Sequence, residues 1–221
     1  MGLIKKILNH TYRPLLQKYL SKDRSYRYKG VSLVIYKGVF HPGFFFSTRF
    51  LLDELNSLPL NGKTLLEPGC GSGIISIWAA KQGALVTATD VNPLAISCCI
   101  ENAKANNVCI NTVESDLFDK IPEMRFDYVV VNPPYYRGNP IGAEQMSWYA
   151  GSDLGYFKKF FLQLPKFVHT GSLVIMVLSE DCEVEAIKEM VESSSFTWIL
   201  RREKRFSWEM NWIFELRLNN E

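Results

Sequence analysis

Hydrophobic and polar positions follow two different periods along this chain. Short apolar runs typical of strands recur through the middle, and stretches with apolar positions three and four residues apart, typical of helices, separate them. Strands are predicted over residues 63–67, 85–90, 110–117, 126–131 and 172–178. Helices are predicted over residues 74–82, 93–106, 155–161 and 182–192. Strands that alternate with helices indicate a parallel sheet whose faces are covered by helices.

The first 60 residues extend this pattern. Apolar positions at helical spacing predict two short helices in the first 20 residues, separated by Pro14. Residues 26–36 alternate around a Lys-Gly turn and predict a hairpin. A third helix, for which Ser47 or Thr48 provides the cap, is predicted to end near residue 58.

The C-terminal stretch closes the predicted sheet. Residues 196–218 predict two antiparallel strands, and the basic run at residues 201–205 is interpreted as a solvated turn. The expected fold is α/β, with a doubly wound, mostly parallel seven-stranded sheet and an antiparallel closing strand in residues 61–221. Residues 1–60 form a short helix and hairpin extension, which we expect to contact a substrate or partner and to cover a cofactor.

Composition bounds the size of the core and the compartment. The 221 residues, 47% of them hydrophobic, are enough for one buried core. No apolar run approaches the roughly 18 residues of a membrane span, and lysines interrupt the apolar N-terminal residues, so neither a span nor a signal peptide is predicted. Five cysteines, an odd number without a paired C-x-x-C arrangement, indicate reduced thiols in a cytoplasmic protein. No metal site is predicted.

The formal charge of +2 hides an asymmetry. Residues 1–30 carry eight basic side chains against one acidic side chain, a net charge of +7, which leaves −5 for the remainder. A basic segment attracts phosphate backbones or acidic partners, and it is equally typical of a solvated helix face. The charge alone therefore leaves the class of partner open.

A glycine-rich loop joins the first predicted parallel strand to its helix. Gly69, Gly71 and Gly73 occupy alternate positions just after a strand that ends at Glu67. A turn without side chains leaves room for a ligand against the backbone and the N-terminus of the following helix. Such a loop is either a cofactor cradle or a tight turn with no ligand.

Polar residues follow the ends of four successive predicted strands. They are Glu67, Asp90, Asp116 and Asn132. Parallel strands bring their carboxyl ends to one edge of a sheet, where open α/β folds bind ligands. Asp90 lies about 20 residues after the loop, the offset at which doubly wound folds place a carboxylate for ribose hydroxyls. We therefore expect these residues to share one site.

Two motifs resemble those of a known enzyme class. Residues 67–73, Glu-Pro-Gly-Cys-Gly-Ser-Gly, resemble the first motif of class I S-adenosylmethionine-dependent methyltransferases, and residues 132–135, Asn-Pro-Pro-Tyr, resemble the amino-methylating signature. The resemblance covers about residues 61–180. It implies a Rossmann-like fold with S-adenosyl-L-methionine as cofactor and S-adenosyl-L-homocysteine as product. The implied cofactor contacts are Glu67, Gly69, Cys70, Gly71, Gly73, Asp90, Val91, Asn92, Asp116, Leu117 and Asn132, with Asp116 and Leu117 at the adenine.

The Asn-Pro-Pro-Tyr turn suits methylation of a planar NH₂ group. The nitrogen lone pair of an amide or base amine is delocalised, so hydrogen-bond acceptors that hold the NH₂ group make it more nucleophilic. The side-chain oxygen of Asn132 and the carbonyl oxygen of Pro133 are two such acceptors, and Pro133 and Pro134 have no N–H groups that would compete. The ring of Tyr135 offers a flat face for a planar acceptor. These four are the predicted catalytic residues.

The resemblance leaves the acceptor open between two classes. A partial match at residues 151–153, Gly-Ser-Asp, together with Tyr135, favours a HemK-like enzyme that methylates a protein glutamine, as in a release factor. The basic front end and the lack of an acidic residue at residues 44–46 favour an RNA or DNA base, at adenine N6 or guanine N2. We prefer glutamine slightly. Target recognition is expected to use the N-terminal region or a small partner subunit.

Two further alternatives have less support. A non-catalytic scaffold of the same fold needs no intact Asn-Pro-Pro-Tyr turn, and a nicotinamide-dependent oxidoreductase carries G-x-G-x-x-G, which is absent here. The three phenylalanines at residues 44–46 are interpreted as core, ahead of a lid over the adenine or a contact patch, because aromatic clusters are usually buried. His41 and His169 receive no role.

Overall fold

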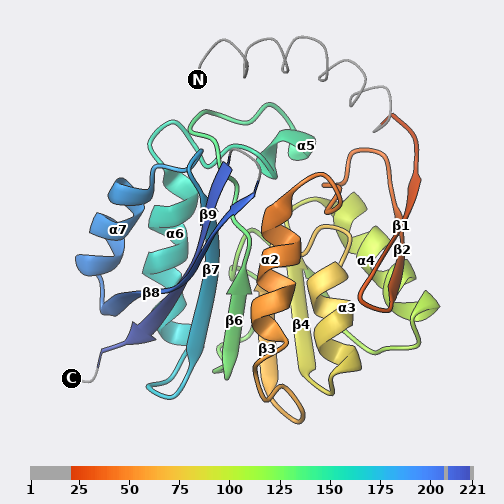
Figure 1. Cartoon of the computed structure of the whole chain (residues 1–221), viewed down its shortest axis with the longest axis horizontal. Coiled ribbons are helices and arrows are strands. Elements are labelled where there is room, and N and C mark those ends of the chain that lie inside the picture. Colours follow the sequence, from red (N-terminus) through yellow and green to blue (C-terminus); the bar gives the residue numbers. More distant parts are fainter. Residues whose placement is uncertain (1–20, 207–208, 220–221) are drawn as a thin grey trace.

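The computed structural model describes residues 21–206 and 209–219 (Figure 1). Its strands are β1 Arg24–Tyr28, β2 Val31–Ile35, β3 Thr64–Pro68, β4 Leu85–Asp90, β5 Asn111–Glu114, β6 Tyr128–Val131, β7 Leu173–Ser179, β8 Phe196–Phe206 and β9 Glu209–Leu218. Its helices are α2 Phe46–Leu55, α3 Ile74–Lys81, α4 Pro93–Ala105, α5 Ala143–Met146, α6 Gly155–Gln163 and α7 Val184–Glu192, with a 3₁₀ turn at Leu164–Phe167. The two helices predicted in the first 20 residues lie outside the described residues.

Seven strands form one sheet in the order β5-β4-β3-β6-β7-β9-β8. The strands from β3 to β7 run parallel to their neighbours, and β9 runs antiparallel between β7 and β8. The predicted doubly wound sheet is thereby confirmed. The chain moves from β3 through β4 to β5 and then returns to the other side of β3 with β6. The ends of β3 and β6 thus flank the reversal of strand order, where open sheets bind ligands.

Successive residues of the central strands contribute side chains to two hydrophobic clusters, one on each face of the sheet. Tyr128 and Val130 of β6 belong to the cluster that includes α2, α3 and α4, and Val129 and Val131 belong to the cluster that includes α6 and α7. This is the two-residue period of a strand. All of β6 is therefore buried, which explains why a continuous apolar run predicts it.

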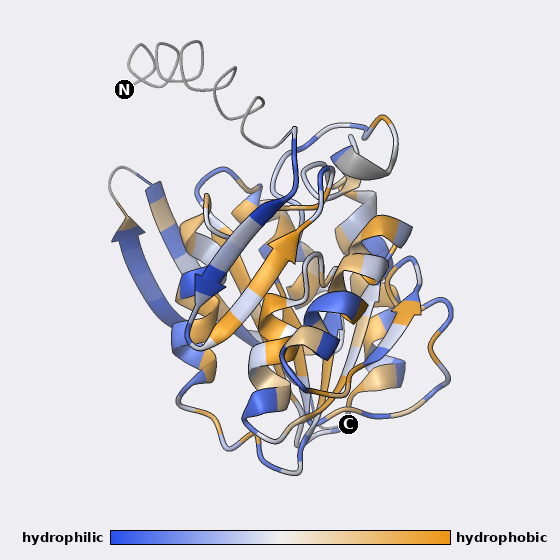
Figure 2. Cartoon of the chain, turned by 90° about the vertical axis from the view of Figure 1, so that its right-hand side faces the viewer, coloured by the Kyte–Doolittle hydropathy of each residue, from blue (hydrophilic) through white to orange (hydrophobic). Residues whose placement is uncertain are grey.

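The predicted hairpin is present as β1 and β2, outside the main sheet. Figure 2 shows it in front of the helices, with β2 apolar and β1 polar. Val31, Leu33 and Ile35 of β2 are buried in the same cluster as α3 and α4. Asn102 of α4 pairs with the backbone of Val34, accepting from its N–H at 2.8 Å and donating to its carbonyl at 3.0 Å. The hairpin is therefore fastened to α4 by packing and by hydrogen bonds.

The start of α2 differs from its prediction. The cap position is Phe45, which makes no side-chain capping hydrogen bond, so neither Ser47 nor Thr48 caps the helix. Both hydroxyl residues lie in the first turn and are 2% and 3% exposed. A hydroxyl at this position can serve a partner outside its own helix, and Thr48 does so, as described below.

The interpretation of residues 44–46 as core is wrong. Phe44 and Phe45 are half-buried, and Phe46 is 38% exposed. Phe45 faces a cavity, whereas Phe46 stacks on Phe206 of β8 with ring centroids 4.8 Å apart. The core beneath α2 is filled instead by leucines further along the helix, Leu51, Leu52 and Leu55, which are fully buried.

The basic run at residues 201–205 is not a turn, because it lies within β8. An irregularity in the pairing of β8 with β9 falls between Leu200 and Arg202. Arg201 and Arg202 both reach Glu54 of α2, at 2.8 and 3.5 Å, and Arg201 also pairs with Glu215 of β9 at 2.5 Å. Arg201 thus joins the edge of the sheet to α2 through two buried carboxylates.

Within the described residues, no helix is long and apolar enough to cross a membrane. The same part of the chain holds no group of three or more His, Cys, Asp or Glu side chains placed to bind a metal ion. All five cysteines are free thiols, and Cys70, Cys98 and Cys99 are buried.

Candidate functional site

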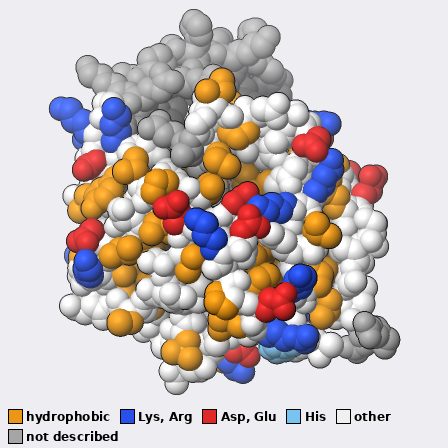
Figure 3. Space-filling view, turned by 180° about the vertical axis from the view of Figure 1, so that it is seen from behind, with side chains coloured by type: hydrophobic (Ala, Val, Ile, Leu, Met, Phe, Trp, Pro, Cys, Tyr) orange, Lys and Arg blue, Asp and Glu red, His pale blue; other side chains and the backbone are white. Residues whose placement is uncertain are grey.

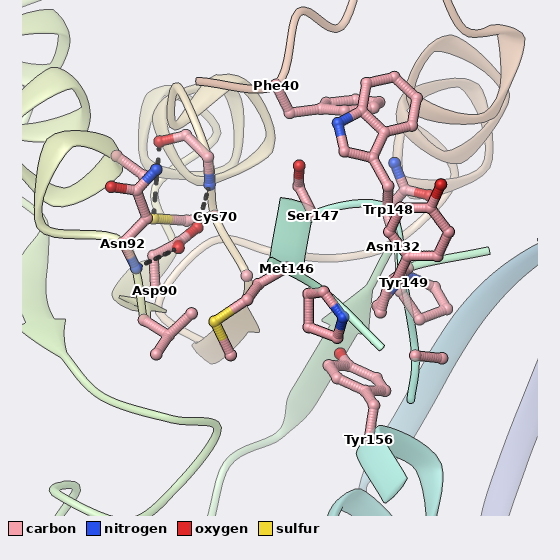
Figure 4. A pocket seen from close by; sticks show the side chains of 18 of the residues that line it. Phe40, Cys70, Asp90, Asn92, Asn132, Met146, Ser147, Trp148, Tyr149 and Tyr156 are labelled. Carbon is pink, nitrogen blue, oxygen red and sulfur yellow. Dashed lines mark hydrogen bonds between the residues drawn. The ribbon is translucent and has the colours of Figure 1, made fainter. Parts of the chain in front are cut away.

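A cavity of about 310 Å³ lies where the parallel strands end, and Figure 4 shows it from close by. Every predicted site residue except Gly73 lines it: Glu67, Gly69, Cys70, Gly71, Asp90, Val91, Asn92, Asp116, Leu117, Asn132, Pro133, Pro134 and Tyr135. The fold therefore brings the glycine loop after β3 and the Asn-Pro-Pro-Tyr turn after β6 to one cavity. These segments are about 60 residues apart in the chain, and the reversal of strand order places them side by side.

The glycine loop contributes space to the cavity rather than hydrogen-bond donors. Gly69 and Gly71 adopt φ angles of 75° and 52°, in the left-handed region, and a Cβ atom at Gly69 would meet nothing within 4 Å. Several loop N–H groups are already used: those of Gly69 and Cys70 donate to the Thr89 carbonyl at 2.7 and 2.8 Å. A ligand can therefore lie close to this backbone without meeting a side chain.

Gly73 has a structural explanation and does not line the cavity. It precedes α3 with a φ angle of 83°. A Cβ atom there would lie 2.5 Å from the Sγ atom of Cys99 on α4. Gly73 thus lets the start of α3 pack against α4.

The side chain of Asp90 is held by two backbone N–H groups, one on each carboxylate oxygen. Its Oδ2 atom accepts a hydrogen bond from Gly71 N, and its Oδ1 atom accepts one from Asn92 N, both at 2.9 Å. Burial raises the pKa of the Asp90 carboxyl, and these N–H groups counter part of that rise. Asn92 caps α4 by accepting from Leu94 N at 3.0 Å, which confirms the predicted cap.

Glu67 is a buried carboxyl in the cavity wall, 3% exposed. Its Oε2 atom accepts hydrogen bonds from the backbone N of Ser76, at 2.8 Å, and from the Ser76 hydroxyl. Burial raises the pKa of Glu67 to about 8, although both hydrogen bonds oppose the rise. Near neutral pH the side chain is therefore largely protonated, and a nearby cation would favour its ionisation.

Asp116 and Leu117 follow β5, which ends at Glu114, earlier than predicted. Asp116 pairs with Lys159 of α6 at 2.6 Å, so its carboxylate is held by another residue of the cavity wall. Leu117 is buried with a φ angle of 54°. A non-glycine residue in this region is uncommon, and such residues cluster at functional sites. The hydroxyl of Tyr156, whose pKa burial raises, also lines this part of the cavity near Asp90 and Asp116.

The side-chain amide of Asn132 is held at both ends. The Tyr135 hydroxyl donates to its Oδ1 atom at 3.0 Å, and its Nδ2 atom donates to Thr48 Oγ1 on α2 at 3.3 Å. Burial raises the pKa of Tyr135 well above its ordinary value, Cys182 adds to the rise, and the nearby Ser47 hydroxyl opposes it. Pro133 and Pro134 are buried, so the turn is rigid on its inner side.

Three aromatic rings cover the cavity beside Asn132. Phe40 and Phe45 stack with centroids 4.9 Å apart, and Trp148 contacts both edge-on, at 5.4 and 5.0 Å. Figure 4 shows Phe40 and Trp148 together above the cavity. The backbone of Tyr136 pairs with Trp148 and Ala150, which folds this segment back over the Asn-Pro-Pro-Tyr turn. We call Phe40, Phe45 and Trp148 the aromatic roof.

Sequence reasoning missed several residues of the cavity wall. They are Phe40, Phe45, Thr48, Trp148, Tyr149 and Tyr156. Phe45 falls in the segment for which a lid was the second interpretation. Thr48 is a hydroxyl residue at the start of a predicted helix, and this position led to its interpretation as a helix cap. Nothing in the local pattern around Trp148 indicates that it meets Phe40, because the contact joins segments more than 100 residues apart.

Comparison with known proteins gives one family and one fold. Residues 31–149 match the family model described as the methyltransferase small domain. A protein of Methanocaldococcus jannaschii, provisionally named a protein N5-glutamine methyltransferase, is 32% identical over 169 residues, 73% of this chain and 83% of that protein. Other curated relatives, methyltransferases for ribosomal protein L11 and for small-subunit ribosomal RNA, are matched over only 30% and 47% of their own length.

Two solved structures share the fold at low sequence identity. The T. thermophilus 16S rRNA N2 G1207 methyltransferase, solved with AdoMet and guanosine, aligns over 90% of this chain and 50% of its own, with 18% identity and a TM-score of 0.67. The E. cuniculi Mtq2–Trm112 complex, which methylates the termination factor eRF1, aligns over 81% of this chain and 98% of the matched chain, with 20% identity and a TM-score of 0.63.

Proposed function

Because the chain belongs to the methyltransferase small-domain family, we propose that it transfers the methyl group of S-adenosylmethionine to the nitrogen of a planar NH₂ group. One observation carries this proposal: the glycine loop and the Asn-Pro-Pro-Tyr turn line the same cavity. The protein is an S-adenosylmethionine-dependent methyltransferase, and the class of its acceptor is what we infer from the site.

The cavity fits S-adenosylmethionine. The cavity has a volume of about 310 Å³, within the range of small-molecule sites, and the backbone at Gly69 and Gly71, which has no side chains, leaves room along one wall. When bound, S-adenosylmethionine supplies a methyl group activated by a positively charged sulfur. We assign the ribose hydroxyls to Asp90, with Val91 and Asn92 beside it, and the adenine to Asp116 and Leu117. Glu67, Cys70 and the glycine loop remain for the amino-acid end.

The Asn-Pro-Pro-Tyr turn is assigned to the acceptor. Asn132 Oδ1 and the Pro133 carbonyl would hold the two hydrogens of the NH₂ group, which directs the nitrogen lone pair out of conjugation. Pro133 and Pro134 bring no N–H group that would compete for those oxygens. The ring of Tyr135 is the face on which the planar group would stack. Positioning of this kind can supply on the order of 7–11 kcal/mol in favourable cases.

We propose a protein glutamine side chain as the acceptor. The M. jannaschii relative supports this choice, because the match extends over 83% of that protein. The partial Gly-Ser-Asp match at residues 151–153 supports the glutamine choice only in part. Gly151 lines the cavity, whereas Asp153 pairs with Lys158 at the surface. Only the glycine of that motif is therefore placed to contact an acceptor.

A nucleic-acid base is the second candidate, and the surface of β8 favours it. Arg202, Lys204 and Arg205 are exposed along this edge strand, which is hydrophilic in Figure 2. Their strand ends beside the stacked rings of Phe46 and Phe206. Cations interleaved with aromatic rings suit a single-stranded nucleic acid. Glu203 interrupts this basic run, and on the rear face acidic and basic side chains are likewise interspersed in the parts coloured in Figure 3.

Labelled methyl transfer into a cell extract separates the two acceptors. The protein is incubated with extract and S-adenosylmethionine carrying a radiolabelled methyl group, and the products are split between protease and nuclease treatment. We expect protease to release the label, nuclease to leave it, and alkaline hydrolysis to liberate labelled methylamine, because an N-methylated amide yields that amine. Label released by nuclease instead would replace glutamine with a base. Absence of cofactor binding by calorimetry would refute the site itself.

Substrate recognition is proposed to use residues 1–60, alone or with a small partner subunit. The E. cuniculi methyltransferase Mtq2 was solved in complex with a second chain, Trm112. Here, part of residues 1–60 borders the cavity directly, since Phe40, Phe45 and Thr48 line it. Co-purification of the full chain from cells, followed by mass spectrometry, tests for a stoichiometric partner.

A further inference from the structure

The side-chain amide of Asn132, in the Asn-Pro-Pro-Tyr turn, donates a hydrogen bond to Thr48 Oγ1 of α2 at 3.3 Å. Thr48 lies 84 residues before Asn132 and is 3% exposed. The helix that carries it is anchored by Leu51, Leu52 and Leu55, which are fully buried. Thr48 Oγ1 is therefore a hydrogen-bonding group at a fixed position in the cavity wall, and here it accepts from Asn132 Nδ2.

The orientation of an asparagine amide decides what it can bind. Its oxygen accepts hydrogen bonds and its nitrogen donates them, and rotation by half a turn about the last side-chain bond exchanges the two ends. Only the oxygen end can hold an acceptor NH₂ group. In this structure the nitrogen end points to Thr48 and the oxygen end accepts from Tyr135. A carbonyl-type oxygen has two lone pairs, so Oδ1 keeps one for the acceptor.

We propose that Thr48 is a positioning residue, which together with Tyr135 holds the amide of Asn132 in the place and orientation in which its oxygen end is available to the methyl acceptor. This inference rests on the proposed function, since it assigns the acceptor NH₂ group to Asn132 Oδ1. Thr48 touches neither reacting atom. Its hydroxyl acts through Asn132 by giving the nitrogen end of the amide a buried hydrogen-bond partner. Without that partner, the buried N–H group would be left unsatisfied, which costs free energy.

The first turn of α2 places two consecutive hydroxyl side chains, Ser47 and Thr48, beside the Asn-Pro-Pro-Tyr turn. Ser47, 2% exposed, lies beside the Tyr135 hydroxyl and opposes the rise in the pKa of that residue. Thr48 meets the nitrogen end of Asn132, and Tyr135 meets the oxygen end. Of the two hydroxyls that resemble a helix cap in the sequence, that of Thr48 bonds to the Asn-Pro-Pro-Tyr turn, and that of Ser47 lies beside it.

Three variants of the full chain test the proposal. Thr48→Val keeps the shape and removes the hydroxyl, and Thr48→Ser keeps the hydroxyl and removes a methyl group. Thr87→Val is the matched control, because Thr87 is 6% exposed and accepts from an asparagine amide, that of Asn111, at 3.4 Å, outside the cavity. Each variant is measured for S-adenosylmethionine affinity by calorimetry, and for kcat and the KM of radiolabelled S-adenosylmethionine in methyl transfer to a fixed amount of extract protein.

Nitrogen-15 NMR of asparagine-labelled protein gives a readout that needs no acceptor. The Asn132 side-chain NH₂ signal is assigned by its loss in Asn132→Asp. In Thr48→Val we expect this signal to shift and to exchange faster with solvent, and in Thr48→Ser to stay near its original position. The same change at Thr87 should leave it unmoved.

In Thr48→Val we expect kcat to fall about tenfold, the equivalent of one lost hydrogen bond at the upper end of its usual range, with cofactor affinity unchanged. Thr48→Ser should restore kcat, and Thr87→Val should leave kcat at the wild-type value. A wild-type kcat in Thr48→Val, or an unmoved Asn132 signal, overturns the proposal. Loss of cofactor affinity in Thr48→Val would also overturn it, because the role would then be structural. If the wild-type protein methylates nothing, the proposed function fails, and the NMR result still decides whether Thr48 holds the amide.

Discussion

Replacement of Glu67 by glutamine should change how the stability of the protein depends on pH. Glu67 is buried, with a pKa raised by that burial from 4.5 to about 8. The Glu67→Gln side chain has nearly the same shape, can still accept from Ser76, and has no proton to lose near neutral pH. The substitution therefore removes the titration and little else.

The sign follows from proton binding in the two states. Between pH 4.5 and about 8 the folded protein holds the Glu67 proton and the unfolded chain has lost it, so the folded state binds more protons. The wild-type protein is therefore stabilised fully below pH 4.5 and loses that contribution as pH rises towards 8. The loss approaches about 1.4 kcal/mol per pH unit, or on the order of 5 kcal/mol across the whole window.

Urea unfolding at intervals from pH 5 to 8, followed by circular dichroism, measures this slope. Other groups also make stability depend on pH: burial lowers the pKa of His41, which opposes the trend, and raises that of Asp90, which adds to it. The informative quantity is consequently the difference between wild type and Glu67→Gln, which should widen in favour of the variant as pH rises. Parallel curves for the two proteins would refute a buried, protonated Glu67.

Three further predictions concern the turn, the loop and the edge strand. Asn132→Ala should lower methyl transfer by about 100-fold or more while cofactor affinity, measured by calorimetry, stays within a small factor. An active variant would show that the acceptor is held elsewhere. Gly73→Ala should cost about 1–3 kcal/mol in urea unfolding, because its Cβ would lie 2.5 Å from Cys99 Sγ at a φ angle of 83°, and Gly69→Ala, in open space, should cost less. Equal losses would contradict the packing argument. Arg201→Met should destabilise the protein by about 2 kcal/mol, since Glu54 and Glu215 would lose their shared partner while Arg202 still pairs with Glu54 and Arg217 with Glu215. A neutral effect on the thermal midpoint would mean that these carboxylates are adequately solvated without it.

Local patterns were sufficient for the parallel sheet, although β5 ends earlier than its pattern predicts and the predicted turn at residues 201–205 lies within β8. The period of apolar residues distinguishes strand from helix, and glycine, proline and asparagine mark turns and caps through their own backbone preferences. The cap at Asn92 and the Lys29-Gly30 turn of the hairpin were predicted on that basis and are present. The convergence of Glu67, Asp90, Asp116 and Asn132 follows as well, because parallel strands share one carboxyl edge.

Only the tertiary structure decided which side chains meet across that edge. A hydroxyl in the first turn of a helix can cap its own backbone or bond to a distant partner, and local sequence does not distinguish these options. Thr48 takes the second option through Asn132. Phe45 and Trp148 form the aromatic roof, and Arg201 pairs with Glu54 and Glu215, because long segments fold back onto the sheet. Contacts between residues far apart in the chain depend on the packing of whole elements, which no short stretch of sequence encodes by itself.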